Sequence, residues 1–290
     1  MVSGGVVDQV RSGLATRLQA LREHEGGTRD GSDPEELHQM RVSVRRMREM
    51  LRSARSFLDR EHSEPLRNEL GWLGRALGPV RDLDVLLEHL REQTAEMPEQ
   101  DAAERLLAGL DAEHERARAD LLAALDSDRY RALLDWVEEA SRELPARESD
   151  AGDDGGSELR DLVLRQFGKL RKDVGKLPDD PPDDRLHALR IRGKKVRYTA
   201  ELAEPALGKP IKRLIKATKK FQDVLGEHQD ACVAEQRLRD LAAEADAGAA
   251  FVAGRLVERE QLRKADRRAR WPGAWDQLVE AEKGVRRGPR

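Results

Sequence analysis

Two segments of this chain, about half a chain apart, carry the same helical pattern of apolar and basic residues. They are residues 37–48 and 186–197, and His38 of the first recurs as His187 of the second. Positions three and four apart share one face of an α-helix. In both segments this spacing places a histidine and several cations beside a stripe of apolar side chains. The apolar stripe predicts a face buried in a helical core, with the basic side chains held at its edge and facing a cleft.

The basic side chains of these segments are the candidate binding residues. Like charges at these spacings repel by about 0.2–0.5 kcal/mol per pair, and a solvated helix usually separates them with Glu. One copy alone would fit an ordinary solvated face, but both copies lack acids at these positions, which favours a site for an anion. We name two sets: the first basic stripe is His38, Arg41, Arg45, Arg46, Arg48 and Arg52, and the second basic stripe is His187, Arg190, Lys194, Lys195 and Arg197.

A second repeated element follows each stripe. Leu77-Gly78 precedes Asp82 in the first half, and Leu225-Gly226 precedes Asp230 in the second. Gly suits the end of a helix and Asp the start of the next, so each element predicts a helix junction. A helix junction alone would explain either copy, but the recurrence at a nearly constant offset indicates an internal duplication.

A third group of cations is found in the second half only. We name it the lysine run, and it contains Lys212, Lys216, Lys219 and Lys220. The corresponding first-half helix is poorer in charge, so the predicted basic surface is lopsided. His228 lies in the second Leu-Gly element, close to the lysine run along the chain, and is added to the candidate binding residues.

Composition predicts an all-α fold. Helix-forming Ala, Leu, Glu and Arg are abundant among the 290 residues, aromatic residues make up 3%, and β-branched runs are absent. We predict two helical bundles related by duplication and pseudo-twofold symmetry around one basic central cavity, lined by both basic stripes. The predicted parts are a first half at 1–145, an acidic Gly-rich linker at 146–156, a second half at 157–285 and a disordered tail at 286–290.

Apolar periodicity and Gly or Pro breaks predict individual helices. Asp33, Pro34 and Glu36 form a helix start with the cap residue, first-turn proline and acid expected there. The predicted helices are 5–23, 34–58, 64–77, 80–95, 100–126, 128–143, 157–176, 184–204, 209–225, 228–246, 248–269 and 273–284.

Charge and cysteine content indicate the compartment and the class of partner. The net charge is only −3, but the signs are segregated: residues 37–56 contain six arginines and one Glu. Cys232 is the single cysteine, which fits a reducing cytoplasm. No apolar stretch approaches the roughly 20 residues of a membrane span. We therefore expect a cytoplasmic protein without a membrane partner.

Motifs for metal, nucleotide or cofactor binding are absent from the sequence. It contains no His-Glu-x-x-His, no Cys/His cluster, no P-loop and no Gly-x-Gly-x-x-Gly. Cations around His38 and His187 would oppose a divalent ion shared by the two histidines. We expect no metal, no cofactor and no catalytic residue.

The two stripes, each followed by Leu-Gly-x3-Asp, resemble the CHAD family, which is named for conserved histidines in an α-helical domain. The resemblance covers residues 5–285. It implies two symmetric helical bundles around a basic groove or pore, and binding of inorganic polyphosphate, with some members associated with polyphosphate granules. It carries anion binding onto both stripes apart from Arg52 and, less directly, onto the lysine run. A triphosphatase activity is not implied, because the sequence lacks a Glu-x-Glu-x-Lys strand.

Three functions remain open on the sequence alone. The favoured one is non-enzymatic binding of inorganic polyphosphate, a linear polyanion that requires a row of cations and no base-stacking platform. Nucleic-acid binding through phosphate contacts is the second, and the scarcity of aromatic residues argues against it. The third is a phosphohydrolase that uses His38 or His187. The sequence does not indicate an oligomeric state.

Overall fold

The computed structural model describes residues 2–147 and 155–287. These residues form nine α-helices and no β-strand, which confirms the predicted all-α class. The chain divides into two compact units, Met1–Gly152 and Asp153–Arg290. Most of the predicted linker, and residues 288–290 of the predicted tail, lie outside the described residues.

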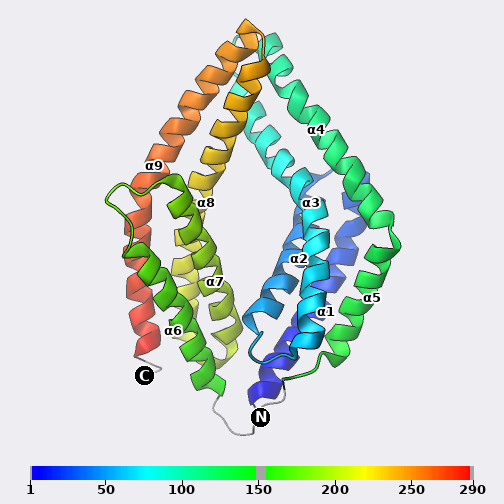
Figure 1. Ribbon diagram of the computed structural model, residues 1–290, viewed down its shortest axis with the longest axis vertical. Helices are drawn as coiled ribbons and strands as arrows, with labels where there is room; N and C mark the ends of the chain where they lie inside the picture. The colour runs from blue at the N-terminus through cyan, green and yellow to red at the C-terminus, as the bar shows by residue number, and fades with distance from the viewer. Residues whose placement is uncertain (1, 148–154, 288–290) are drawn as a thin grey trace. The chain divides into compact units, whose positions relative to one another are not determined.

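The first unit contains five helices (Figure 1). Helix α2 packs against both α1 and α3, α3 packs against α4, and α5 packs against α1. Apolar side chains from all five helices fill the interior, so the unit has a core of its own. The helices are α1 (Val2–Asp30), α2 (Pro34–Ser53), α3 (Arg60–Thr94), α4 (Gln100–Asp126) and α5 (Asp128–Glu143).

The second unit contains four helices, of which α8 and α9 form a long hairpin (Figure 1). Helix α7 packs against both α6 and α8. The helices are α6 (Gly155–Val174), α7 (Asp183–Leu207), α8 (Lys209–Glu244) and α9 (Ala247–Arg286). Helix α9 thus includes the first residue of the predicted tail. None of the described helices has the length and apolarity needed to cross a membrane.

Helix α2 begins where the sequence predicted. The side chain of Asp33 accepts a hydrogen bond of 2.8 Å from the backbone N–H of Glu35, and Pro34 opens the first turn. The predicted end at Leu58 is wrong, because α2 stops at Ser53. The next residues turn instead, and Leu58 pairs as an isolated β-bridge with Ala146, just beyond α5. Leu58 is fully buried there, so packing decides where the helix ends.

The predicted helix breaks at the two Leu-Gly elements are also wrong. Gly78 lies inside α3, Gly226 inside α8 and Pro272 inside α9, so the described residues form nine helices where the sequence predicted twelve. In the part of the chain described, the glycines with positive φ are Gly31 and Gly208. Gly208, with φ 64°, separates α7 from α8. Prolines predicted to break helices are also tolerated, as Pro79 lies within α3.

Candidate anion-binding faces

Helix α2 buries the predicted apolar stripe and holds the first basic stripe at its edge. Apolar residues at the expected spacing, including Met40, Val44 and Met47, are fully buried. Most residues of the first basic stripe are therefore half-buried, while Arg45 is exposed. The position of these cations follows directly from the period of the apolar residues beside them.

Helix α3 adds the acid Asp82 and the cation Arg81 to the edge of α2 that holds the first basic stripe. Nη1 of Arg41 lies 2.8 Å from Oδ1 of Asp82, which joins α2 to the first Leu-Gly element. The Asp82 carboxylate therefore acts as an ion-pair partner within a helix, and not as the helix start that the sequence predicted. The neighbouring Arg81 was missed as a site residue; its place beside Asp82 in the repeated element was the available signal.

The environment of His38 disfavours its charged form. Burial lowers the pKa of His38, and the guanidinium groups of Arg81, Arg45 and Arg41 lower it further, while Glu35 opposes the shift. Arg81 comes from α3 and the other two arginines from α2. Side chains of two helices thus create a positive field at one histidine.

The guanidinium group of Arg48 lies against the backbone of α3, where two glycines leave that face of the helix without side chains. A Cβ added at Gly71 would lie 3.5 Å from Nε and Nη2 of Arg48, and one at Gly74 would lie 3.7 Å from Nη1. The two glycines therefore leave room for the guanidinium against the helix backbone. Nε of Arg48 is buried and has no hydrogen-bond partner among the described residues.

Cations outnumber acids around Arg48. Burial lowers the pKa of Arg48, Glu49 opposes this shift, and three neighbouring arginines strengthen it. Glu49 pairs with one of these arginines and Glu64 with another. The arginines are Arg67, Arg75 and Arg52. This end of the first basic stripe therefore combines an excess of positive charge with an unsatisfied donor.

Helix α7 presents the second basic stripe in the same manner. Leu186, Leu189 and Val196 are fully buried, and every residue of the stripe is half-buried. A Cβ added at Gly226 of α8 would lie 3.5 Å from Nε of Arg190, so this guanidinium also lies on a glycine of the neighbouring helix.

Two members of the second basic stripe have different surroundings. Nδ1 of His187 is buried without a hydrogen-bond partner among the described residues. Arg197 donates from Nη2 to the Tyr198 hydroxyl at 3.0 Å, and its Nε lies 3.4 Å from a carboxylate oxygen of Glu201. The side chain of Arg197 is 15% exposed, so internal partners hold it in place.

The lysine run lies on the exposed side of α8. Lys216, Lys219 and Lys220 are exposed, while Ile211, Leu214 and Phe221 on the same helix are fully buried. The remaining member pairs with an acid of α7: Nζ of Lys212 lies 3.6 Å from Glu204. The lysines add positive charge to the second unit at the solvent boundary.

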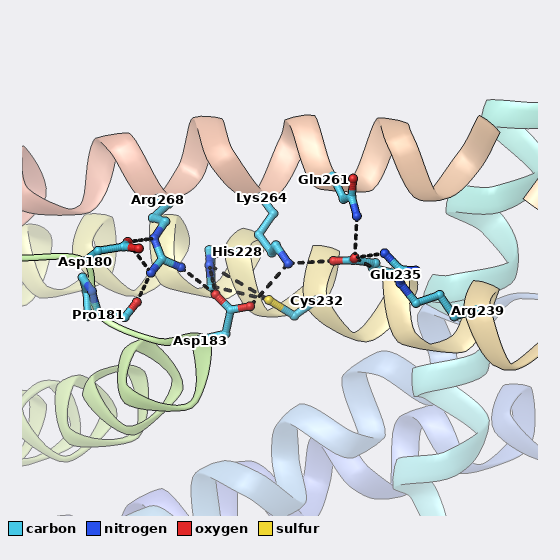
Figure 2. Close-up of polar contacts among 10 residues, drawn as sticks. All are labelled: Asp180, Pro181, Asp183, His228, Cys232, Glu235, Arg239, Gln261, Lys264 and Arg268. Carbon is cyan, nitrogen blue, oxygen red and sulfur yellow. Dashed lines mark hydrogen bonds and ion pairs between the residues drawn. The ribbon is translucent and has the colours of Figure 1, made fainter. Parts of the chain in front are cut away.

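His228 is not presented to solvent with these cations. It is 1% exposed, and its Nε2 lies 3.2 Å from Oδ1 of Asp183 at the start of α7 (Figure 2). Burial lowers the pKa of His228; Asp183 opposes this, and Arg268 and Lys264 lower it further. The structure therefore places this candidate inside a polar cluster between α7, α8 and α9.

That polar cluster was not predicted from the sequence. Lys264 of α9 lies 2.7 Å from Glu235 and 3.4 Å from Asp183, and Arg268 lies 2.7 Å from Asp183 (Figure 2). Burial raises the pKa of Glu235, but hydrogen bonds from Lys264, Gln261 and Arg239 outweigh it and lower the value to about 2. Burial raises the pKa of the nearby Cys232 thiol to about 12.

Comparison with known proteins identifies the family. The model of the CHAD domain matches residues 12–239 of this chain. The chain belongs to the CHAD family. Two curated relatives are uncharacterized proteins of Mycobacterium tuberculosis, MT2285 of strain CDC 1551 and Rv2226 of strain H37Rv. Each is 30% identical over 234 residues, which cover 77% of this chain and 44% of the relative. The chain thus spans less than half the length of these relatives.

Solved structures show the same all-α fold. A CHAD domain from the plant Ricinus communis is 26% identical, with a TM-score of 0.63 over 97% of this chain and 91% of that one. PptA from Streptomyces chartreusis has a TM-score of 0.73 at 24% identity, over 94% of this chain and 99% of that one. The CHAD assignment made from the two stripes is therefore confirmed.

The basic stripes of this CHAD domain supply hydrogen-bond donors and positive charge. Guanidinium groups offer planar forks of donors that suit phosphate oxygens, and ammonium groups offer point charges. Arg48 and Arg190 approach helix backbones at glycines, which keeps their planes close to the helix surface. Chemically, the two faces suit an extended anion better than an apolar ligand.

Proposed function

We propose that this CHAD domain binds inorganic polyphosphate, without catalysis, through the first basic stripe, the second basic stripe and the lysine run. Arg81 joins the first stripe because it acts on His38 together with Arg41 and Arg45. Binding of this kind would place the protein at polyphosphate granules in the cytoplasm.

The environment of Arg48 is the observation that carries the proposal. Its Nε is a buried donor that finds no partner in the described part of the chain, in a region where arginines outnumber acids. An unsatisfied buried donor costs about 1–3 kcal/mol. When the Arg48 side chain turns toward solvent, a phosphate oxygen would accept from this donor and offset the repulsion among the arginines.

The aromatic residues near the second basic stripe favour polyphosphate over nucleic acid. Tyr198 and Phe221, which lie beside the second basic stripe and in the lysine-run helix, are 5% and 0% exposed. Buried rings cannot stack on bases, and base stacking is the main sequence-tolerant contact of single-strand binders. Polyphosphate has no bases, so a row of cations is sufficient to bind it.

A competition assay tests the proposal. Long-chain polyphosphate and tripolyphosphate should displace a labelled polyphosphate more effectively than duplex DNA does at equal phosphate concentration, and no orthophosphate should be released. Arg48→Ala should weaken binding by about tenfold, which corresponds to one charge-assisted hydrogen bond. Arg131→Ala, which removes an exposed arginine of α5, is the matched control and should leave affinity unchanged.

Other outcomes would assign the stripes differently. Equal or better displacement by DNA would favour a nucleic-acid binder. Release of orthophosphate that is lost in His38→Ala or His187→Ala would favour a phosphohydrolase. Equal affinity of the Arg48→Ala and Arg131→Ala variants would remove Arg48 from the site.

A further inference from the structure

We propose that Asp183, His228 and Cys232 form a binding site for a divalent transition metal of the Zn²⁺ class. This site is separate from the basic stripes and does not depend on polyphosphate binding. The three residues offer a carboxylate oxygen, an imidazole nitrogen and a sulfur, and these ligand atoms all lie within 4.8 Å of one another. Oxygen, nitrogen and sulfur together are a donor set that zinc accepts.

The spacing of the ligand atoms approaches that of a tetrahedral centre. Zinc bonds of about 2.0–2.3 Å place neighbouring ligand atoms roughly 3.3–3.7 Å apart. Nε2 of His228 lies 3.2 Å from Oδ1 of Asp183 and 4.0 Å from Sγ of Cys232. Sγ of Cys232 lies 3.8 Å from Nδ1 of His228, so the Cys232 side chain must move toward Nε2 for the three ligands to surround one ion.

Two helices hold these ligands in place. His228 and Cys232 are one turn apart on α8, so their side chains lie on one face of that helix. Asp183 is the first residue of α7 and points toward this face in Figure 2. His228 is almost completely buried, whereas Asp183 and Cys232 are partly exposed, so the cluster borders solvent on the side of these two ligands.

The cations of α9 compete with a metal for the same carboxylate. Arg268 lies 2.7 Å from Oδ1 of Asp183, and Lys264 lies 3.4 Å from Oδ2. Lys264 is closer to Glu235, at 2.7 Å, and can keep that contact when an ion takes the Asp183 oxygen. The thiol of Cys232 must lose its proton on binding, because the thiolate is the ligand. Arg268 must give up its contact with Oδ1 of Asp183 and can keep its 2.8 Å contact with Asp180. Both cations therefore weaken the site without blocking it.

Cobalt titration of the untagged full chain tests this proposal. Co²⁺ should bind at one equivalent and give the sulfur-to-cobalt charge-transfer absorption of a thiolate ligand, and Zn²⁺ should abolish the signal by displacement. Cys232→Ser should lose the absorption and weaken Zn²⁺ binding at least tenfold, as measured against a chromogenic chelator. Asp183→Asn should also weaken it, while the exposed His62→Ala serves as the control and should not.

The Lys264→Met variant tests the proposal through an expected gain in Zn²⁺ affinity, whereas the other variants are expected to lose affinity. Removal of the competing cation should strengthen Zn²⁺ binding about tenfold, because one unit charge near the ion is lost. A misfolded variant would bind Zn²⁺ more weakly, so misfolding cannot explain a gain in affinity. The proposal is overturned if Co²⁺ produces no charge-transfer absorption, or if Zn²⁺ affinity is the same in the wild-type, Cys232→Ser and Lys264→Met proteins.

Discussion

His38 lies where burial and three arginines all oppose a further positive charge. The pKa of its imidazole is therefore below the usual value of about 6.5 in the absence of an anion. A bound polyanion would reverse the electrostatic part of this effect. The histidine then takes up a proton as the anion binds, and binding becomes linked to pH.

The direction of the pKa change in His38 predicts how polyphosphate affinity depends on pH. A ligand that raises the pKa of His38 binds more tightly as pH falls through the pKa of the bound state, and the gain ends below the pKa of the free state. Affinity for polyphosphate should therefore rise as pH falls from about 8 to about 6. The double variant His38→Ala, His187→Ala should lose this dependence and still bind through Arg and Lys.

Calorimetry in two buffers of different ionisation enthalpy measures the proton uptake directly. A buffer-dependent apparent enthalpy near pH 7 supports a histidine that gains charge on binding. The competing interpretation is a neutral histidine that only fixes its helix by hydrogen bonding. Identical apparent enthalpies in the two buffers would support that interpretation.

The local sequence wrongly predicted that helices end at particular Gly and Pro residues. Gly and Pro are weak helix formers, so Gly78 and Pro79 together predicted the end of a helix. In the structure α3 continues through both residues, with Leu77 and Val80 buried on either side of them. Tertiary packing outweighs a local penalty of a few kcal/mol, and the sequence of one segment does not reveal that packing.

Substitution of Gly78 by alanine tests this continuity. A Cβ at Gly78 meets nothing within 4 Å beyond its own helix and chain neighbours, but the ring of Pro79 disfavours a Cβ on the preceding helical residue. Gly78→Ala should therefore change the free energy of unfolding by less than the about 0.5–1 kcal/mol that helix propensity alone would add. A Cβ at Gly193 would lie 3.3 Å from Cδ1 of Phe221, so Gly193→Ala should gain less or lose stability. Denaturant unfolding of both variants gives the comparison. A Gly78→Ala variant destabilised by well over about 1–2 kcal/mol would indicate a left-handed glycine and a real helix end.

The positions of the binding helices were predictable, but the partners of their side chains were not. The spacing of the apolar residues predicted which face of α2 and of α7 is buried, and therefore where His38 and His187 lie. The glycines beneath Arg48 lie on another helix, and sequence distance alone does not bring them together. The burial of His228 was not evident from the sequence for the same reason, because its partner Asp183 comes from the start of α7.

Each of the two units carries a basic stripe with its own buried apolar support. Charge is segregated in the sequence although the net charge is only −3, so the field at the stripes exceeds what the total suggests. The internal duplication and the single basic cavity lined by both stripes stay predictions from the sequence. A polyanion held by many modest contacts should lose affinity gradually as single cations are removed.

The salt dependence of polyphosphate binding tests the central claim most directly. Each phosphate neutralised releases counterions, so log affinity should fall steeply with log salt concentration, by close to one unit per contact if duplex DNA is a guide. The Arg45→Ala, Lys194→Ala double variant should bind more weakly and lower this slope by up to about 2. The control Arg131→Ala, Lys169→Ala removes two exposed cations and should keep both affinity and slope. A slope that is the same for the wild-type chain and the Arg45→Ala, Lys194→Ala variant would show that these side chains do not neutralise phosphate and would contradict the account.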